Sequence, residues 1–217
     1  MYEIDLILPK ENITIEEAQK LLSKIKEEFF QNKFIPECFE LPFYIAISKY
    51  PEMKKTKITT FEKSFGLTLQ AQPDFDFLFI NNKKRSYHLN INIDHSKAHG
   101  VLFTELPFDA QVGIMAHELS HILDYQKMSK LKLLHFSVMY LCIKFRKRLE
   151  RHTDQVVIER GLGWQLYDWA DFAMYRSGSP RRHKYYKHGY YLLPEEILDE
   201  MRSFPKLYPE HIHLKLR

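Results

Sequence analysis

The chain of 217 residues has few glycines and few cysteines. Seven glycines make a fold built on glycine-rich phosphate loops a poor fit, and a composition of 45% hydrophobic and 28% charged residues excludes a disordered chain. The two cysteines, Cys38 and Cys142, lie in apolar segments, so we interpret them as buried small side chains and not as a disulfide framework. The length fits one domain, residues 1–217, with one substantial core.

The N-terminal segment lacks the basic start and the long apolar stretch of a secretion signal, so we expect a cytoplasmic protein. The chain also lacks the uninterrupted run of about 20 apolar residues that spans a bilayer. Residues 131–145 are apolar but are interrupted by Lys132, His135 and Ser137, with basic residues on both sides. We expect a buried helix there, and the alternative is a helix that lies on an anionic membrane surface.

The pattern of apolar residues divides the chain into two halves, 1–106 and 107–217. In the first half, Thr14 and Glu17 form a capping box that predicts a helix start, and alternating residues further on predict strands. In the second half, apolar spacings of three and four predict helices. The sequence thus predicts an α+β fold in which a small, mostly antiparallel sheet packs against a helical half. Strands are expected near the N-terminus and at residues 43–48, 57–72, 75–80 and 86–94, and helices of the second half at residues 108, 130, 150 and 194 onward.

The helix predicted from Phe108 carries the residues with the clearest chemical meaning. His117 and His121 lie one helical turn apart, on a different side from the apolar residues that would anchor the helix in a core. Two imidazoles at this spacing suit a tetrahedral Zn²⁺, and Glu118 lies next to the place of a metal-bound water. The alternative is an amphipathic helix with two solvent-facing histidines. The apolar residues that flank the histidines in the sequence disfavour this alternative. The expected core face consists of Phe108, Val112, Met115, Leu119 and Ile122.

A third metal ligand is expected further along the chain. Glu150 and Asp154 are four residues apart and therefore share one helical face. One carboxylate can reach the metal while the other accepts a hydrogen bond from a ligand histidine. His152 points to a different face and is the alternative ligand, and a solvated helix face is the alternative for the acidic pair. Gly161 lies on the same helical face as Glu150 and Asp154 and would allow a close approach to the helix that carries the histidines.

Together the two motifs resemble those of gluzincin zinc metallopeptidases, HExxH at residues 117–121 followed by ExxxD at residues 150–154. The resemblance covers residues 112–161 and implies a zincin-like fold. It also implies that His117, His121 and Glu150 are zinc ligands, that Glu118 is the general base and that Asp154 supports a ligand histidine. The sequence departs from the compact gluzincins in the length of the segment between the motifs and in Thr153, where many relatives have alanine.

The chemistry that the resemblance implies is metal-assisted hydrolysis of a peptide or protein substrate, with Glu118 transferring the proton. The developing oxyanion needs a further donor. The basic and aromatic residues 176–191 offer several donors, and since no spacing selects among them we name Tyr190 and His188 as candidates. The resemblance also implies that the strand at residues 87–94 is the edge strand along which an extended substrate pairs, and the alternative is an ordinary sheet strand.

Residues 176–191 also interleave basic with aromatic side chains, as single-stranded nucleic-acid surfaces do. We favour a solvated basic loop packed by tyrosines, so nucleic acid is not an expected partner. The competing function is a non-enzymatic binding protein on a zincin scaffold, recruited to acidic partners by its basic C-terminal half. A third possibility is a membrane-surface protein that uses residues 131–145.

Overall fold

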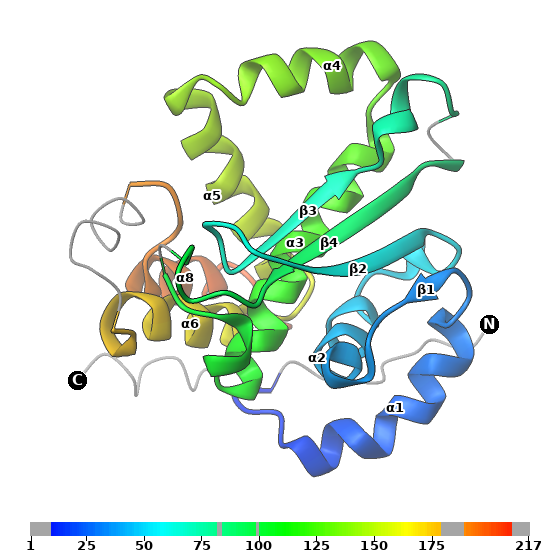
Figure 1. Cartoon of the computed structure of the whole chain (residues 1–217). Coiled ribbons are helices and arrows are strands. Elements are labelled where there is room, and N and C mark those ends of the chain that lie inside the picture. The colour runs from blue at the N-terminus through cyan, green and yellow to red at the C-terminus, as the bar shows by residue number, and fades with distance from the viewer. Residues whose placement is uncertain (1–9, 82–83, 99, 179–188, 210–217) are drawn as a thin grey trace.

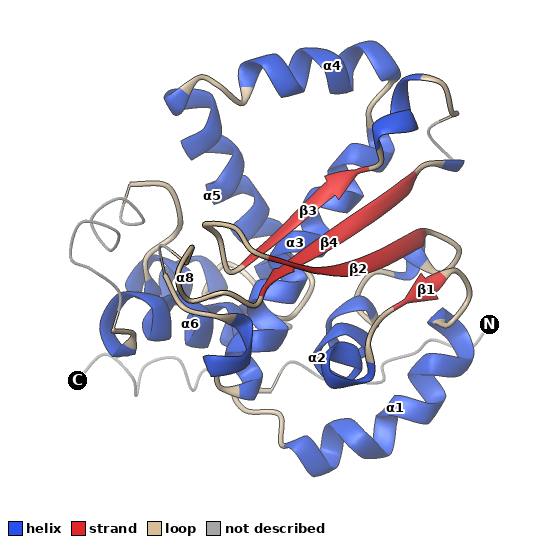
Figure 2. Ribbon diagram, in the orientation of Figure 1, coloured by secondary structure: helices blue, strands red, loops and turns tan. Residues whose placement is uncertain are grey.

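The computed structural model describes residues 10–81, 84–98, 100–178 and 189–209 (Figure 1). The expected N-terminal strand and His188 lie outside these residues. Helices make up most of the described chain, and four strands form one sheet (Figure 2). The α-helices among the described residues are α1 (Ile15–Phe29), α2 (Glu37–Ile47), α3 (Phe108–Lys127), α4 (Lys130–Met139), α5 (Ile143–Glu159), α6 (Gly163–Asp171) and α8 (Pro194–Met201). The strands are β1 (Lys33–Phe34), β2 (Lys57–Lys63), β3 (Leu69–Pro73) and β4 (Ser86–Asn92).

The sheet has the strand order β1-β2-β4-β3. β2 runs parallel to β1 and to β4, whereas β3 runs antiparallel to β4. The α+β class is confirmed, but the prediction of a mostly antiparallel sheet is wrong, because two of the three pairings are parallel. Alternation of apolar and polar residues reports which face of a strand is buried and says nothing about its direction.

Two predicted strands have a helical conformation. Residues 43–48 belong to α2 and the serine that follows it, and the helix is buried along Pro42–Ile47 as it packs against α1 and α3. A short apolar run is compatible with either a buried strand or a buried helix, and packing on both sides favours the helix here. Residues 75–80 begin as the 3₁₀ turn η2 (Phe75–Leu78), where Phe75 is 95% exposed.

The structure confirms some of the predicted helix boundaries and shifts others. The capping box forms as predicted: the Glu17 N–H donates to Thr14 Oγ1 at 3.2 Å, and the Thr14 N–H donates to the Glu17 carboxylate at 3.2 Å. The predicted helices at residues 130–149 and 150–161 divide elsewhere, since α4 ends at Met139 and α5 begins at Ile143. Glu150 therefore lies near the middle of α5 and not at the start of a separate helix.

The expectation that residues 131–145 form a buried helix is wrong for most of α4. Leu133 is buried, but Leu131 is 79% exposed and Val138 60% exposed. Cys142 and Cys38 are both exposed, which also corrects the interpretation of the cysteines as buried. Apolar neighbours in the sequence do not show which side of a short helix finds a partner. No helix in the described part of the chain is both long enough and apolar enough to cross a bilayer.

The helix α3 lies at the centre of the fold. Fourteen of its 20 residues are buried, because it packs against α2, α5 and α6 and against β3. The predicted core face is confirmed at Val112, Met115, Leu119 and Ile122, which are all inaccessible to solvent, while Phe108 is partly buried. One hydrophobic core includes side chains from both halves of the chain. The position of α3 is therefore set by contacts on nearly all of its sides.

Two glycines have distinct roles next to α3. A Cβ at Gly113 would lie 2.1 Å from the backbone oxygen of Gln165, so the backbones of α3 and α6 touch at this point. Gly161, which the sequence suggested for such a close approach, instead has φ of 82° and ends α5. Its N–H donates to Ile158 O at 2.9 Å and the Leu162 N–H donates to Val157 O at 3.2 Å, the pattern of a Schellman motif.

Alanine at position 113 is expected to destabilise the fold. Alanine favours a helix over glycine by about 1 kcal/mol, but the new methyl group meets the α6 backbone, which cannot rotate away. We expect Gly113→Ala to lower the free energy of unfolding by about 1–3 kcal/mol, as measured by urea denaturation. Gly178→Ala is the control, because nothing lies within 4 Å of the added methyl group. Equal unfolding midpoints for Gly113→Ala and the wild type would contradict the close approach.

Candidate metal centre

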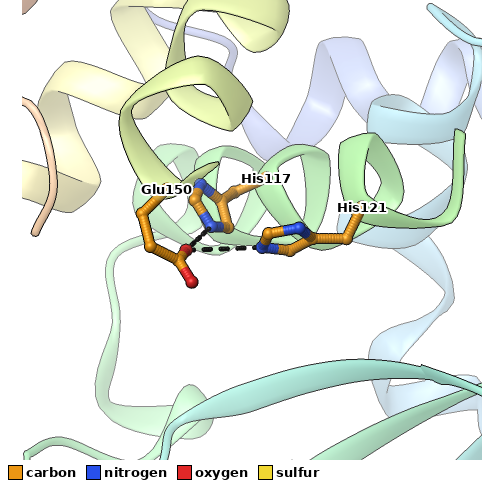
Figure 3. Close-up of side chains that lie close together, drawn as sticks. All are labelled: His117, His121 and Glu150. Atoms are coloured by element: carbon orange, nitrogen blue, oxygen red, sulfur yellow. Dashed lines mark hydrogen bonds and ion pairs between the residues drawn. The ribbon is translucent and has the colours of Figure 1, made fainter. Parts of the chain in front are cut away.

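The helix α3 brings two histidines together in the interior. His117 is 4% exposed and His121 is 6% exposed. Their ring centroids lie 4.9 Å apart with an interplanar angle of 82°. Figure 3 shows that both imidazoles project from the same side of α3 toward Glu150, which comes from α5. The two rings are therefore held by the helix that the core surrounds, and not by a loop.

Glu150 completes a group of three ligand atoms. Its Oε2 lies 3.1 Å from His117 Nε2 and 3.4 Å from His121 Nε2. The three ligand atoms all lie within 4.8 Å of one another, and all three residues are buried. Burial by itself raises the pKa of the Glu150 carboxyl, but the neighbouring imidazoles of His121 and His117 outweigh burial and lower it. This buried group of two nitrogens and one carboxylate oxygen could hold a metal ion.

The alternative ligand His152 is turned away from this group. Its side chain is 56% exposed, and its Nε2 lies 3.7 Å from a carboxylate oxygen of Asp124. The structure thus places Glu150, and not His152, beside the two histidines. The choice follows from helical geometry, because a step of two residues on α5 rotates the side chain by about 200° around the helix.

Asp154 contacts the outer nitrogen of His117. Its Oδ1 lies 2.7 Å from His117 Nδ1, and its Oδ2 accepts the Leu192 N–H at 2.8 Å. This arrangement directs Nε2 of His117 toward Glu150. Burial alone lowers the pKa of the His117 imidazole, but hydrogen bonds to Asp154 and Glu150 outweigh burial and raise the pKa well above its ordinary value. The negative surroundings therefore favour a cation, whether a proton or a metal ion.

Thr153 has a corresponding contact with His121, which the sequence did not suggest. Its Oγ1 lies 3.4 Å from His121 Nδ1 and donates its own proton to Leu149 O at 3.0 Å. Since the hydroxyl proton is used, the oxygen can accept the N–H of His121. Thr153 is inaccessible to solvent. The residue at which the sequence departs from many gluzincins thus provides a partner for the second histidine.

Glu118 lies beside the histidines and contacts the sheet. It is 8% exposed, and its Oε2 accepts the Ala71 N–H of β3 at 2.6 Å. Burial raises the pKa of the Glu118 carboxyl, and the charges of His121 and His117 oppose the increase. A carboxylate with a raised pKa is suited to accept and release a proton near neutral pH.

A pocket of about 550 Å³ opens at this group. It is lined by His117, His121, Glu150 and Glu118, and by residues along the whole of β3. Most of the remaining wall is apolar and comes from elements on both sides of the histidines. The apolar wall includes Leu166, Trp169 and Ile197 on α6 and α8, and Phe77, Leu133 and Phe136 on η2 and α4.

The edge strand next to the pocket is β3. The expectation that residues 87–94 form the edge is wrong, because β4 is paired on both of its sides. Toward β4, the Asn92 N–H donates to Thr68 O at 3.1 Å and the Asp74 N–H donates to Ser86 O at 3.0 Å. Because backbone groups alternate along a strand, Leu69 and Ala71 direct theirs away from β4.

The candidate tyrosine from the sequence lies outside the pocket wall. Tyr190 accepts a hydrogen bond from Arg146 Nη2 at 3.1 Å, with the guanidinium 5.1 Å above its ring. Its neighbour Tyr191 lines the pocket, with its ring 5.6 Å from that of His117. Tyr140 also lines the pocket and donates to Glu150 Oε1 at 3.2 Å. Two adjacent tyrosines cannot be told apart by composition, and only packing shows which one faces the ligands.

Comparison of the chain with protein-family models, with curated proteins and with solved structures found no match. The interpretation of the site therefore depends on its own geometry.

The ligand group predicts which residues are needed for metal binding. We expect the purified wild-type chain to bind about one divalent ion, and Glu150→Ala to lose most of that binding because the only carboxylate of the group is removed. His152→Ala is the matched control on the same helix and is expected to keep the metal. Metal content after dialysis, measured by mass spectrometry, tests both. Loss of metal in His152→Ala but not in Glu150→Ala would reverse the assignment.

Asp154→Asn is expected to weaken metal binding without removing a ligand. The substitution keeps the size of the side chain but removes the charge next to His117 Nδ1. Loss of such a partner typically weakens affinity by roughly 10- to 100-fold, which titration with Co²⁺ or Zn²⁺ would measure. Asp124→Asn is the control, since this carboxylate lies beside Lys127 and His152. An affinity equal to that of the wild type would show that Asp154 does not support the ligand.

Proposed function

We propose that this protein is a zinc-dependent hydrolase, a peptidase of gluzincin type on a zincin-like fold. The observation that carries the proposal is the convergence of two sequence motifs at one buried point. Glu150 lies against both histidines of the first motif, while Asp154 holds the outer nitrogen of His117. Separate solvated helix faces would not bring these groups together, because buried carboxylates are costly unless they have partners.

Zinc is the metal that suits the donors. Two imidazole nitrogens and one carboxylate oxygen are a ligand set of catalytic zinc sites, which keep a further position open for water or substrate. Calcium and magnesium instead favour sites made of oxygen ligands. When bound, zinc supplies Lewis acidity, which makes water more acidic and polarises a carbonyl group. The pocket beside the ligands gives a substrate access to that position.

Glu118 is the group that would move the proton. It follows His117 directly, lines the same pocket and is held in place by the Ala71 N–H. In the proposed reaction, its carboxylate accepts the proton of the attacking water and later donates it to the leaving amine. Burial raises the pKa of Glu118, which favours this exchange near neutral pH.

The edge of β3 favours an extended peptide as the substrate. The backbone groups of Leu69 and the carbonyl of Ala71 face away from β4 along the pocket, where a peptide can pair as an additional strand, while the Ala71 N–H donates to Glu118. The apolar walls on both sides of the histidines suit apolar side chains on either side of the cleaved bond. A short peptide with bulky apolar residues is therefore the proposed substrate class.

Tyr191 is the proposed donor to the developing oxyanion, in place of Tyr190 and His188, since Tyr140 already donates its proton to Glu150. The ring of Tyr191 lines the pocket. Burial, with the charge of Glu150 in second place, raises the pKa of the Tyr191 phenol, so that it keeps its proton at neutral pH. A protonated phenol in a buried site can donate a hydrogen bond to the charge that forms in the transition state.

Glu118→Gln is expected to keep the metal but lose hydrolysis. The amide retains the shape of the carboxylate and cannot accept the proton of water, so the turnover rate should fall by roughly 10²- to 10⁴-fold. Cleavage of a peptide library by zinc-loaded chain, followed by mass spectrometry, measures this loss. Glu62→Gln on the exposed part of β2 is the control.

The same experiment separates the peptidase from a non-enzymatic binding protein on this scaffold. A wild-type chain that takes up zinc but cleaves no peptide of the library would favour the binding protein. Equal cleavage by the wild type and Glu118→Gln would also overturn the proposal, because the activity would then come from elsewhere.

A further inference from the structure

The helix α4 presents an apolar surface to solvent. Leu131 is 79% exposed, Leu134 47%, Val138 60% and Leu141, just after the helix, 82%. These residues follow one another at steps of three, four and three, and so lie on one side of the helix. We call these four residues the α4 face. A row of large apolar side chains that is exposed to solvent on one helix often indicates an interaction surface.

The opposite side of α4 already has a partner. Leu133 is 1% exposed, and the ring of Phe136 packs edge-on against those of Tyr125 and Phe145, with centroid distances of 5.6 and 5.4 Å. The helix is therefore held in place from within, and the α4 face is not needed for the core. In Figure 1, α4 lies at the top of the view, at the far end of the molecule from α1.

The charges around the α4 face are all of one sign in the sequence. Residues 125–149 contain basic side chains and no Asp or Glu. Five of these basic residues are exposed, namely Lys127, Lys130, Lys132, Lys144 and Arg148. The basic residues of this segment are Lys127, Lys130, Lys132, Lys144, Arg146, Lys147 and Arg148.

An apolar face with basic flanks fits an anionic bilayer better than a second copy of the chain. Two copies that meet through the α4 face would bring their basic flanks together, and like charges repel. Anionic headgroups attract those flanks, while the apolar side chains enter the boundary with the acyl chains. We propose that the α4 face docks this protein on the surface of an anionic lipid bilayer.

Docking through the α4 face would not require the proposed peptidase activity. Leu133 and Phe136 line the pocket from the inner side of the same helix. Docking through the α4 face would place the wall of the pocket at the membrane surface.

Vesicle co-sedimentation of the full chain tests the proposal. We expect binding to vesicles that mix phosphatidylserine with phosphatidylcholine, little binding to phosphatidylcholine alone, and weaker binding as salt is added. Leu131→Glu/Leu141→Glu should reduce binding by more than roughly tenfold, because charged groups replace the inserted side chains. The matched control is Phe30→Glu/Phe34→Glu, which changes residues of 62% and 57% exposure away from α4.

A second variant tests the charges and leaves the apolar residues intact. Lys130→Gln/Lys132→Gln should weaken binding to the mixed vesicles by roughly 25-fold, about fivefold for each basic residue near the surface. Because these side chains are exposed, the fold should be kept, and circular dichroism checks this.

The proposal is overturned if the wild-type chain does not bind mixed vesicles at low salt, or if both α4 variants bind as well as the wild type. A contact between copies of the chain would appear in light scattering as a dimer that Leu131→Glu/Leu141→Glu converts to a monomer, with vesicles unbound. An acidic protein partner would likewise leave the vesicles without bound chain. Either result would exclude the bilayer as the partner.

Discussion

A buried carboxylate joins the two helices that form the site. Glu150 reaches from α5 to both imidazoles of α3, and Tyr140 donates to its other oxygen. A charge removed from water is costly unless it is paired or hydrogen-bonded, so the carboxylate and the two histidines require one another. The same requirement accounts for the partners of the outer ring nitrogens, which are Asp154 for His117 and Thr153 for His121.

The remainder of the fold keeps these helices in register. The core surrounds α3, Gly113 lets the α6 backbone touch it, and the left-handed Gly161 ends α5 and turns the chain into α6. On the other side, β3 donates the Ala71 N–H to Glu118 and lines the pocket along the edge that faces away from β4. The polar groups of the site are thus positioned mainly by apolar packing and by contacts with the backbone.

The helix α4 has two different sides, which explains the long apolar run in this part of the sequence. Leu133 and Phe136 face the pocket, whereas Leu131 and Val138 face solvent between basic flanks. Apolar residues on both sides of a helix ordinarily indicate burial. Here the apolar residues form a pocket wall on one side of the helix and an exposed surface on the other. Hydropathy alone does not distinguish such a helix from a fully buried one.

The features that depend on spacing within one helix could be predicted from the sequence. His117 with His121, and Glu150 with Asp154, are placed by the 3.6-residue turn, and the capping box at Thr14 is equally local. Long-range packing sets the direction of the strands, the choice of β3 as the edge, the tyrosines that line the pocket and the exposure of α4. These features depend on contacts between segments far apart in the chain, and residue patterns within a single segment do not specify them.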